Sequence, residues 1–196
     1  MIRMKLLLAA FPPELGDLKD DPPPGWWVDT TGVGSSTAAA ATAFLLERKK
    51  PGRVLFVGGC GAYDERLPIG TIFSPDFVLA TSVEEERGES YRPSIEAVRW
   101  LCTWDLPFPH HPVVTPPAIT RSEEGVRLLS RMAPAEHLEL NGVFAACNAA
   151  GVPVAAALIV VNEVGPKAHE QWLENHKALG QRLIEALRAS GALERE

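Results

Sequence analysis

The sequence predicts an α/β protein that folds as a single domain over residues 1–196, with a three-layer α/β/α sandwich around a central mixed sheet. The chain has 196 residues, of which 46% are hydrophobic and 22% charged, a composition typical of one globular domain. Short apolar runs typical of strands alternate with helical patterns along the chain. Several runs are apolar at consecutive positions, which favours strands covered by helices on both faces.

The first half of the chain is marked by glycine and proline breaks between periodic segments. Strands are predicted over residues 6–10, 26–28, 53–59 and 69–80. Between them we expect a surface loop (16–25), a glycine turn (32–36) and an Ala-rich helix (37–50). Two lysines followed by Pro-Gly end that helix, since basic residues suit a helix C-terminus and Pro-Gly stops the helix.

The second half contains the clearest buried strand, over residues 152–161. A short strand is also expected at 113–114, and helices over 92–104, 122–132, 142–150 and 168–189. Ser122 precedes two glutamates, so we expect it to cap its helix. The last helix is amphipathic and closes the fold.

Charge and cysteine content narrow the function classes. The net charge is -6, from 19 Lys+Arg and 25 Asp+Glu, and no basic stripe is present, which argues against nucleic-acid binding. The longest apolar run is too short to cross a bilayer, and no signal peptide precedes the first strand. Three widely separated cysteines indicate reduced thiols and a cytoplasmic location.

Two glycine turns follow predicted strands, where ligand sites of open α/β sheets usually lie. Gly32-x-Gly34 lacks the third glycine of a dinucleotide fingerprint, and the Gly58–Gly61 turn lacks the lysine of a P-loop. The histidines do not form a metal-ligand pattern, and no Gly-x-Ser-x-Gly elbow occurs. We therefore expect no metal and no cofactor, and these glycines either line a ligand site or only permit tight turns.

A few polar residues interrupt the apolar pattern at strand and helix ends. Glu14 follows the first strand and is either a catalytic base or a solvated acid. Glu139 and Asn141 precede a helix and bind a ligand or cap that helix. Asn162 ends the most buried strand and contacts a ligand or shapes a turn.

The order of six short segments resembles the nucleoside phosphorylase/nucleosidase superfamily over nearly the whole chain. They are Leu8–Leu15, Thr31–Ala40, Val57–Ala62 (similar to V-G-S-C-G-A), Leu67–Ile72, Leu138–Ala145 (similar to v-E-M-E-G-A-A) and the 152–162 strand. The resemblance implies a phosphorylase/hydrolase-like fold, a small-molecule nucleoside as ligand and a homo-oligomer. The end of the last strand is similar to that of futalosine hydrolases, with Asn162 followed by Gly165, Lys167 and Trp172.

The resemblance also implies roles for individual residues. Glu14 takes the position of the catalytic glutamate and Asn162 that of the base-contacting residue, while Glu139 and Asn141 take the ribose-binding positions. The base pocket is implied to be lined by Gly58, Gly59, Cys60, Thr115, Ile119 and Leu140.

The sequence departs from the family pattern at four of its usual contacts. Phe56 replaces an arginine, Gly59 a serine, Asn141 a glutamate and Ile119 an aromatic residue. Losing the arginine and the serine disfavours phosphate binding, although Arg66 or Arg87 could compensate from other loops.

The residues permit hydrolysis of an N-glycosidic bond, in which Glu14 activates water. The Asn162 amide contacts the base and suits a 6-oxopurine. Two alternatives remain open: a diverged protein that binds a nucleoside-like ligand without turnover, and a phosphate-dependent phosphorylase.

Overall fold

The structure is a computed structural model that describes residues 3–96 and 98–194. Its strands are β1 (Lys5–Ala9), β2 (Trp26–Thr30), β3 (Val54–Ala62), β4 (Ile72–Phe73), β5 (Phe77–Ala80), β6 (Arg99–Leu101), β7 (Val113–Thr115), β8 (Ala135–Glu136) and β9 (Val154–Glu163). Its helices are the 3-10 helix η1 (Pro12–Lys19), α1 (Ser35–Lys49), α2 (Val83–Glu86), α3 (Glu123–Leu129), α4 (Leu140–Ala149) and α5 (Ala168–Ala189).

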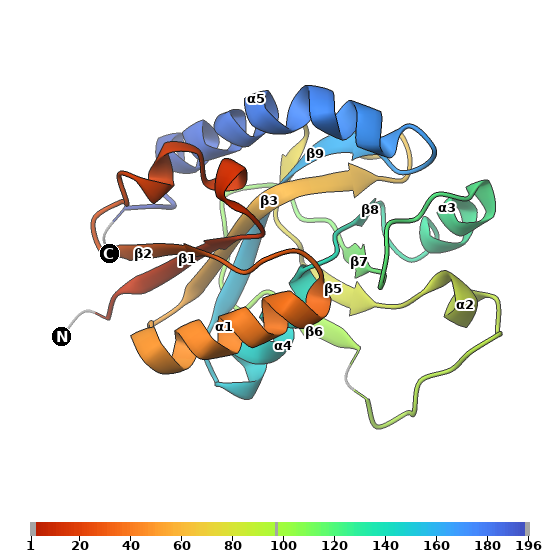
Figure 1. Ribbon diagram of the computed structural model, residues 1–196, viewed down its shortest axis with the longest axis horizontal. Coiled ribbons are helices and arrows are strands. Elements are labelled where there is room, and N and C mark those ends of the chain that lie inside the picture. Colours follow the sequence, from red (N-terminus) through yellow and green to blue (C-terminus); the bar gives the residue numbers. More distant parts are fainter. Residues whose placement is uncertain (1–2, 97, 195–196) are drawn as a thin grey trace.

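The described strands form one mixed sheet of nine strands. Seven follow the order β2-β1-β3-β8-β7-β5-β6, while β9 pairs with β3 and β4. The pairs of β1 with β2, β1 with β3 and β3 with β9 are parallel, whereas β8 and β4 pair antiparallel with β3 and β9. In Figure 1, α5 covers one face of the sheet, and α1 and α4 cover the other. The predicted three-layer α/β/α architecture with a mixed sheet is confirmed.

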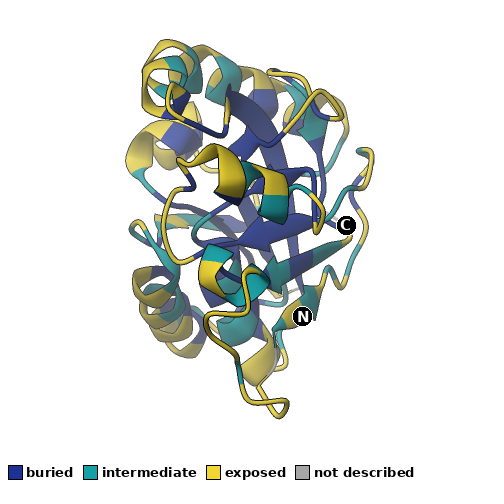
Figure 2. Cartoon of the chain, turned by 90° about the vertical axis from the view of Figure 1, so that its right-hand side faces the viewer, coloured by how far each residue is buried: buried dark blue, intermediate teal, exposed yellow. Residues whose placement is uncertain are grey.

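The central strands are buried on both faces, which explains their uninterrupted apolar sequences. In β1, Leu6 and Leu8 pack into the cluster that contains α1 and α4, while Leu7 packs toward α5 and η1. Figure 2 shows the sheet as buried and the outer helix surfaces as exposed. No helix of the described part of the chain is long and apolar enough to span a membrane.

Gly142 determines how closely α1 and α4 approach each other. A Cβ atom at this position would lie 2.0 Å from the carbonyl oxygen of Ser35 and 2.9 Å from the amide nitrogen of Ala39. Only glycine therefore permits the close crossing of the two helices. The crossing brings the first turn of α1 next to the first turn of α4.

Three sequence predictions need correction. The turn predicted at Gly58–Gly61 is wrong, because these residues lie within β3, which continues to Ala62 and pairs with β9. The helix predicted over 92–104 is wrong: β6 lies there and pairs antiparallel with β5, and residue 97 of that range lies outside the described residues. Alternate exposure along Arg99–Leu101 has the period of a strand, and Pro93 disfavours a continuous helix. The loop predicted from residue 16 begins later, because η1 extends to Lys19.

Most other boundaries agree closely. The last helix spans residues 168–189 as predicted, and the Ser122 hydroxyl oxygen caps α3 by accepting a hydrogen bond from the Gly125 amide at 3.0 Å. The 69–80 segment divides into β4 and β5 around Ser74-Pro75.

Candidate active site

Glu14 lies at the centre of the candidate site, in η1 just beyond the end of β1. Its residue exposure is 9%. Oε2 accepts a hydrogen bond from the Ala10 amide at 3.1 Å, and Oε1 accepts one from the Gly59 amide at 2.9 Å. The carboxylate therefore bridges two neighbouring parallel strands toward their C-terminal ends, the edge at which ligands bind in α/β sheets.

The electrostatic environment of Glu14 favours its protonated form. Burial raises the pKa of this carboxyl from 4.5 to about 7, the negative charge of Glu139 raises it as well, and the amide of Gly59 opposes the rise. A carboxylic acid with a pKa of about 7 can both accept and release a proton near neutral pH.

Glu139 reaches the same region from the turn between β8 and α4. Its side chain is buried, and Oε1 accepts a hydrogen bond from the Gly34 amide at 2.8 Å. Gly34 precedes α1 with φ of 90°, a backbone conformation that favours glycine, and the N-terminus of α1 attracts a negative charge. The Glu139 carboxylate thus binds the start of α1, and it makes no side-chain cap on α4.

Asn141 is held by two side chains at the crossing of α1 and α4. The Trp100 indole donates a hydrogen bond to Oδ1 at 2.8 Å, and Nδ2 donates one to the Ser35 hydroxyl at 3.3 Å. Two of the four hydrogen-bonding positions of this amide are therefore used within the protein.

Gly58 forms the floor of a narrow polar niche. A Cβ atom at position 58 would lie 3.1 Å from Glu14 Oε1, 3.2 Å from His137 Nε2 and 3.2 Å from the Phe56 ring. A side chain at this position would crowd the carboxylate and the imidazole, and glycine avoids that crowding. The niche contains Glu14, His137 and Gly58, and Glu139 lies beside it.

Asn162 contacts a different set of residues. Its Nδ2 donates a hydrogen bond to the Glu163 carbonyl at 3.0 Å. A Cβ atom on Gly61 would lie 3.0 Å from the same nitrogen. Glu136 pairs with the same glycine across the sheet, and a register shift lies between Cys60 and Gly61. The convergence of Glu14 and Asn162 on one ligand stays a prediction.

The remaining predicted pocket residues differ in exposure. Cys60 and Leu140 are buried among apolar side chains on the α1–α4 side, and burial and the charges of nearby acids raise the pKa of the Cys60 thiol. Thr115 is buried, and its hydroxyl has no hydrogen-bond partner within the described residues. Ile119 is 58% exposed. Their contact with a ligand stays a prediction.

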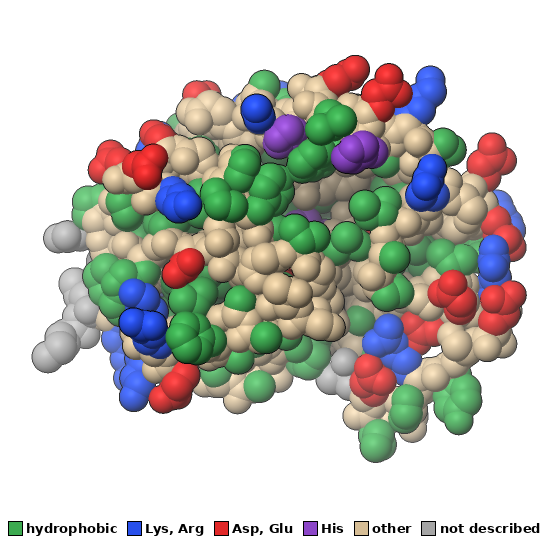
Figure 3. Space-filling view, in the orientation of Figure 1, with side chains coloured by type: hydrophobic (Ala, Val, Ile, Leu, Met, Phe, Trp, Pro, Cys, Tyr) green, Lys and Arg blue, Asp and Glu red, His purple; other side chains and the backbone are tan. Residues whose placement is uncertain are grey.

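An aromatic stack stands next to Glu14. Trp172 stacks on His176 at 4.1 Å between ring centroids and on His169 at 6.0 Å, and the Phe11 ring lies 5.8 Å from Trp172. Phe11 immediately precedes η1, so the stack connects the start of α5 to the segment that carries Glu14. In Figure 3 the surface is hollowed below the histidines of α5.

Phe56, Arg66 and Arg87 bear on whether a phosphate could bind. Phe56 is completely buried, with its ring against His137. Arg66 pairs with Asp64, and Arg87 pairs with Glu124, so neither guanidinium is free to compensate. Within the described residues there is also no cluster of three or more potential metal ligands.

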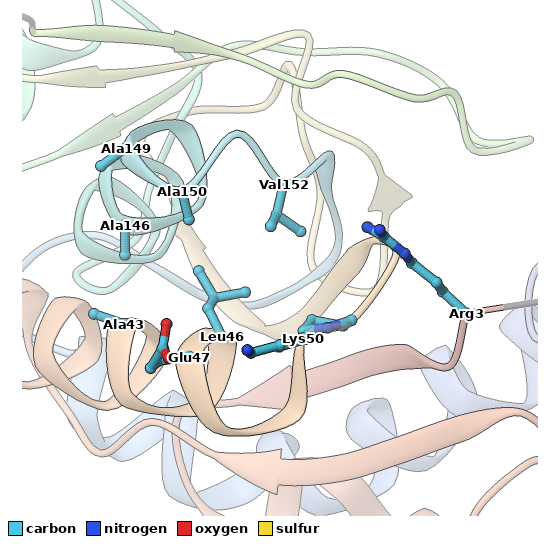
Figure 4. Close-up of a pocket in the computed structure, with 10 residues that line it drawn as sticks. Arg3, Ala43, Leu46, Glu47, Lys50, Ala146, Ala149, Ala150 and Val152 are labelled. Carbon is cyan, nitrogen blue, oxygen red and sulfur yellow. The ribbon is translucent and has the colours of Figure 1, made fainter.

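A separate cavity of about 460 Å³ lies at the other ends of α1 and α4 (Figure 4). Arg3 and Lys50 contribute positive charge to it, and Leu46 and Val152 contribute apolar surface. Cations suit the negative ends of the two helices. Because Gly34 and Glu139 lie at the opposite ends of these helices, this cavity is distinct from the candidate site.

Sequence reasoning missed His137, Trp100 and Glu136. Glu136 and His137 follow directly on a buried segment, and Glu136 accepts a hydrogen bond from the Tyr63 hydroxyl at 2.6 Å. The signal that could have found them is three titratable residues within four positions, at 136, 137 and 139, in an otherwise apolar stretch.

The chain has the fold of the nucleosidases of the nucleoside phosphorylase/nucleosidase superfamily. The 5'-methylthioadenosine/S-adenosylhomocysteine nucleosidase of Helicobacter pylori, solved with butyl-thio-DADMe-Immucillin-A, superposes with a TM-score of 0.83 at 14% identity, covering 96% of this chain and 99% of that one. The futalosine hydrolase of Helicobacter pylori gives 0.82 at 14% identity, with coverages of 96% and 98%.

A third solved structure extends the likeness to another organism. The corresponding nucleosidase of Colwellia psychrerythraea, in complex with adenine, gives a TM-score of 0.80 at 16% identity, with coverages of 94% and 93%. No protein-family model and no curated protein matches the sequence. The resemblance predicted from the six segments is therefore confirmed at the level of the fold.

Proposed function

We propose that this protein hydrolyses the N-glycosidic bond of a purine-type nucleoside and favours 6-oxopurine bases, as a futalosine hydrolase does. The observation that carries the proposal is the pair of buried acids Glu14 and Glu139, since Glu14 has a pKa of about 7. Arg66, Arg87, Arg92 and Arg188 form their ion pairs with other carboxylates. Such a site complements the positive charge that develops on the sugar during cleavage.

The proposed mechanism assigns one task to each polar group. Glu14 takes a proton from a water molecule, the water oxygen bonds to C1′, and the electrons of the C1′–N bond leave with the base. Asn162 donates a hydrogen bond to the departing base, while Glu139 and Asn141 hold the ribose hydroxyls. The implied pocket is lined by Gly58, Gly59, Cys60, Thr115, Ile119 and Leu140.

The base preference rests on Asn162. The structural neighbours include nucleosidases named for adenosine derivatives and a hydrolase named for futalosine. A carboxylic acid accepts a hydrogen bond from the amino group of adenine, whereas an amide can donate to N7 or O6 of a 6-oxopurine. Asparagine therefore favours the second kind of base.

Of the two alternatives, one has specific support and the other is disfavoured. Binding without turnover is favoured because Asn141 is hydrogen-bonded to Trp100 and Ser35, which leaves its amide fewer hydrogen-bonding positions for a ribose. Phosphorolysis requires an anion site, and the buried acids together with Phe56 oppose it.

One assay panel separates the three functions. Free base is measured after incubation with futalosine, inosine, adenosine or methylthioadenosine, with and without phosphate, and binding of each is measured by calorimetry. Base release without phosphate supports hydrolysis, release only with phosphate supports phosphorolysis, and binding without release supports the diverged binding protein. Faster release from adenosine than from inosine would contradict the 6-oxopurine preference.

We also propose a homo-oligomer in the cytoplasm. The first part follows from the superfamily resemblance, and light scattering of the purified protein tests it. The second follows from three separated cysteines, Cys60, Cys102 and Cys147, all of which are free thiols in the structure.

A further inference from the structure

His137 is a buried titratable residue to which the proposed mechanism gives no task. It lies in the turn between β8 and α4, with 4% of its surface exposed. Its ring stands edge-on to Phe56, with 5.1 Å between centroids and 88° between planes. This contact fixes the plane of the imidazole.

The hydrogen bonds of His137 indicate which ring nitrogen carries the proton. Nδ1 lies 3.2 Å from the Glu139 amide, and a backbone N–H can only donate. Oε2 of Glu139 is also 3.2 Å from Nδ1. A proton on Nδ1 would point at the proton of the Glu139 amide, so Nδ1 is the acceptor. Burial lowers the pKa of His137, so the ring is a neutral imidazole with its N–H at Nε2.

Nε2 faces the niche that contains Glu14. A Cβ atom on Gly58 would lie 3.2 Å from Nε2 and 3.1 Å from Glu14 Oε1. Nε2 and Oε1 are therefore at most about 6.3 Å apart. One water molecule with two hydrogen bonds of about 2.8 Å at its tetrahedral angle joins atoms about 4.6 Å apart, a separation that this upper limit allows. Within residues 3–96 and 98–194, no group is hydrogen-bonded to Nε2. Nε2 is not among the completely enclosed side-chain atoms that lack a partner, so a water or a ligand can reach this donor and satisfy it.

We propose that His137 is a further catalytic residue, whose Nε2–H holds the water molecule that Glu14 deprotonates. The proposal rests on the hydrolysis proposed above. In the step, one water proton passes to Glu14, the water oxygen bonds to C1′, and the C1′–N electron pair leaves with the base. His137 donates a hydrogen bond throughout and neither gains nor loses a proton.

Two substitutions and one matched control test the role in turnover. His137→Phe keeps a ring against Phe56 but removes the donor, whereas His137→Gln keeps an N–H near the position of Nε2. His111→Phe is the control, because His111 also stands edge-on to a phenylalanine, Phe73, at 5.8 Å and 78°. We expect kcat to fall about 100-fold in His137→Phe and less than about 5-fold in His137→Gln. KM should stay the same, and His111→Phe should match the wild type.

A second readout does not depend on turnover. The titration of Glu14 is followed by carbon-13 NMR of labelled glutamate, assigned with Glu14→Gln, and the His137 tautomer by nitrogen-15 NMR. Because the shared water donates to the ionised carboxylate, His137→Phe should raise the pKa of Glu14, and His137→Gln should leave it near the wild-type value. Glu139 and Cys60, the other titratable groups near Glu14, are the same in every variant.

The outcomes separate this proposal from the proposed function. Base release by the wild type together with an unchanged kcat in His137→Phe overturns the role of His137 and leaves hydrolysis intact. A wild type that releases no base, with a raised Glu14 pKa in His137→Phe, defeats hydrolysis and supports the shared-water arrangement. An unchanged Glu14 titration, or a proton found on Nδ1, overturns the proposal in either case.

Discussion

Replacing Glu14 with glutamine should leave the stability near the wild-type value at pH 5 and increase it as the pH rises. In the folded protein the pKa of Glu14 is about 7 instead of 4.5. Folding therefore favours the protonated acid, and this contribution is complete below pH 4.5 and is lost as the pH rises through 7. At 1.36 kcal/mol per pKa unit, the free energy of unfolding of the wild type falls below its low-pH value by about 0.8 kcal/mol at pH 5 and by about 3.3 kcal/mol at pH 8.

Urea unfolding of the wild type and of Glu14→Gln at the two pH values measures this difference. The free energy of unfolding of the variant, relative to the wild type, should rise by about 2.5 kcal/mol between pH 5 and pH 8. Losing part of the bonds to Ala10 and Gly59 adds an offset of about 1 kcal/mol that is independent of pH. Glu47→Gln, at an exposed acid of α1, controls for the removal of one charge. A stability difference that is the same at pH 5 and pH 8 would refute the reasoning.

Three further predictions concern packing, base choice and charge. Gly142→Ala should destabilise the protein by at least about 3 kcal/mol in urea unfolding, because its Cβ would lie 2.0 Å from the Ser35 carbonyl oxygen; wild-type stability would contradict the close crossing. Asn162→Asp should shift kcat/KM from inosine toward adenosine by roughly 5- to 150-fold, and an unchanged ratio would show that Asn162 only shapes its turn. A nucleoside analogue with a protonated pyrrolidine in place of ribose should bind about 10-fold more tightly for each unit that the pH rises toward 7, because Glu14 ionises over this range. Calorimetry that shows the same pH dependence of binding in Glu14→Gln would contradict this.

The sheet was predictable where strands are buried on both faces. β1, β3 and β9 contain long apolar runs because α1 and α4 cover one face and α5 the other. β6 and β8 were missed because they are three and two residues long. Their strand character comes from pairing with β5, β3 and β7, which depends on tertiary structure.

The site was predictable only in part, and for a related reason. Glu14 follows a strand that the sequence identifies, Gly59 lies within another, and the structure joins the two residues by a hydrogen bond. The bond from Trp100 to Asn141 depends on where β6 lies beside α4, and β6 was predicted as a helix. The direction of His137 Nε2 depends on the edge contact with Phe56, which no local pattern encodes.

The polar groups of the niche reduce the stability of the fold. Glu14 is buried where its charge is disfavoured, Glu139 adds a second acid nearby, and the Nε2–H of His137 faces a space with no partner among the described residues. Apolar side chains in their place would pack against Phe56 and the surrounding leucines without these penalties. Unfavourable polar groups that share one small space, at the edge of a sheet where ligands bind, are typical of a functional site. The same groups then set opposite pH trends, since a higher pH ionises Glu14 for water activation and weakens the fold that holds it.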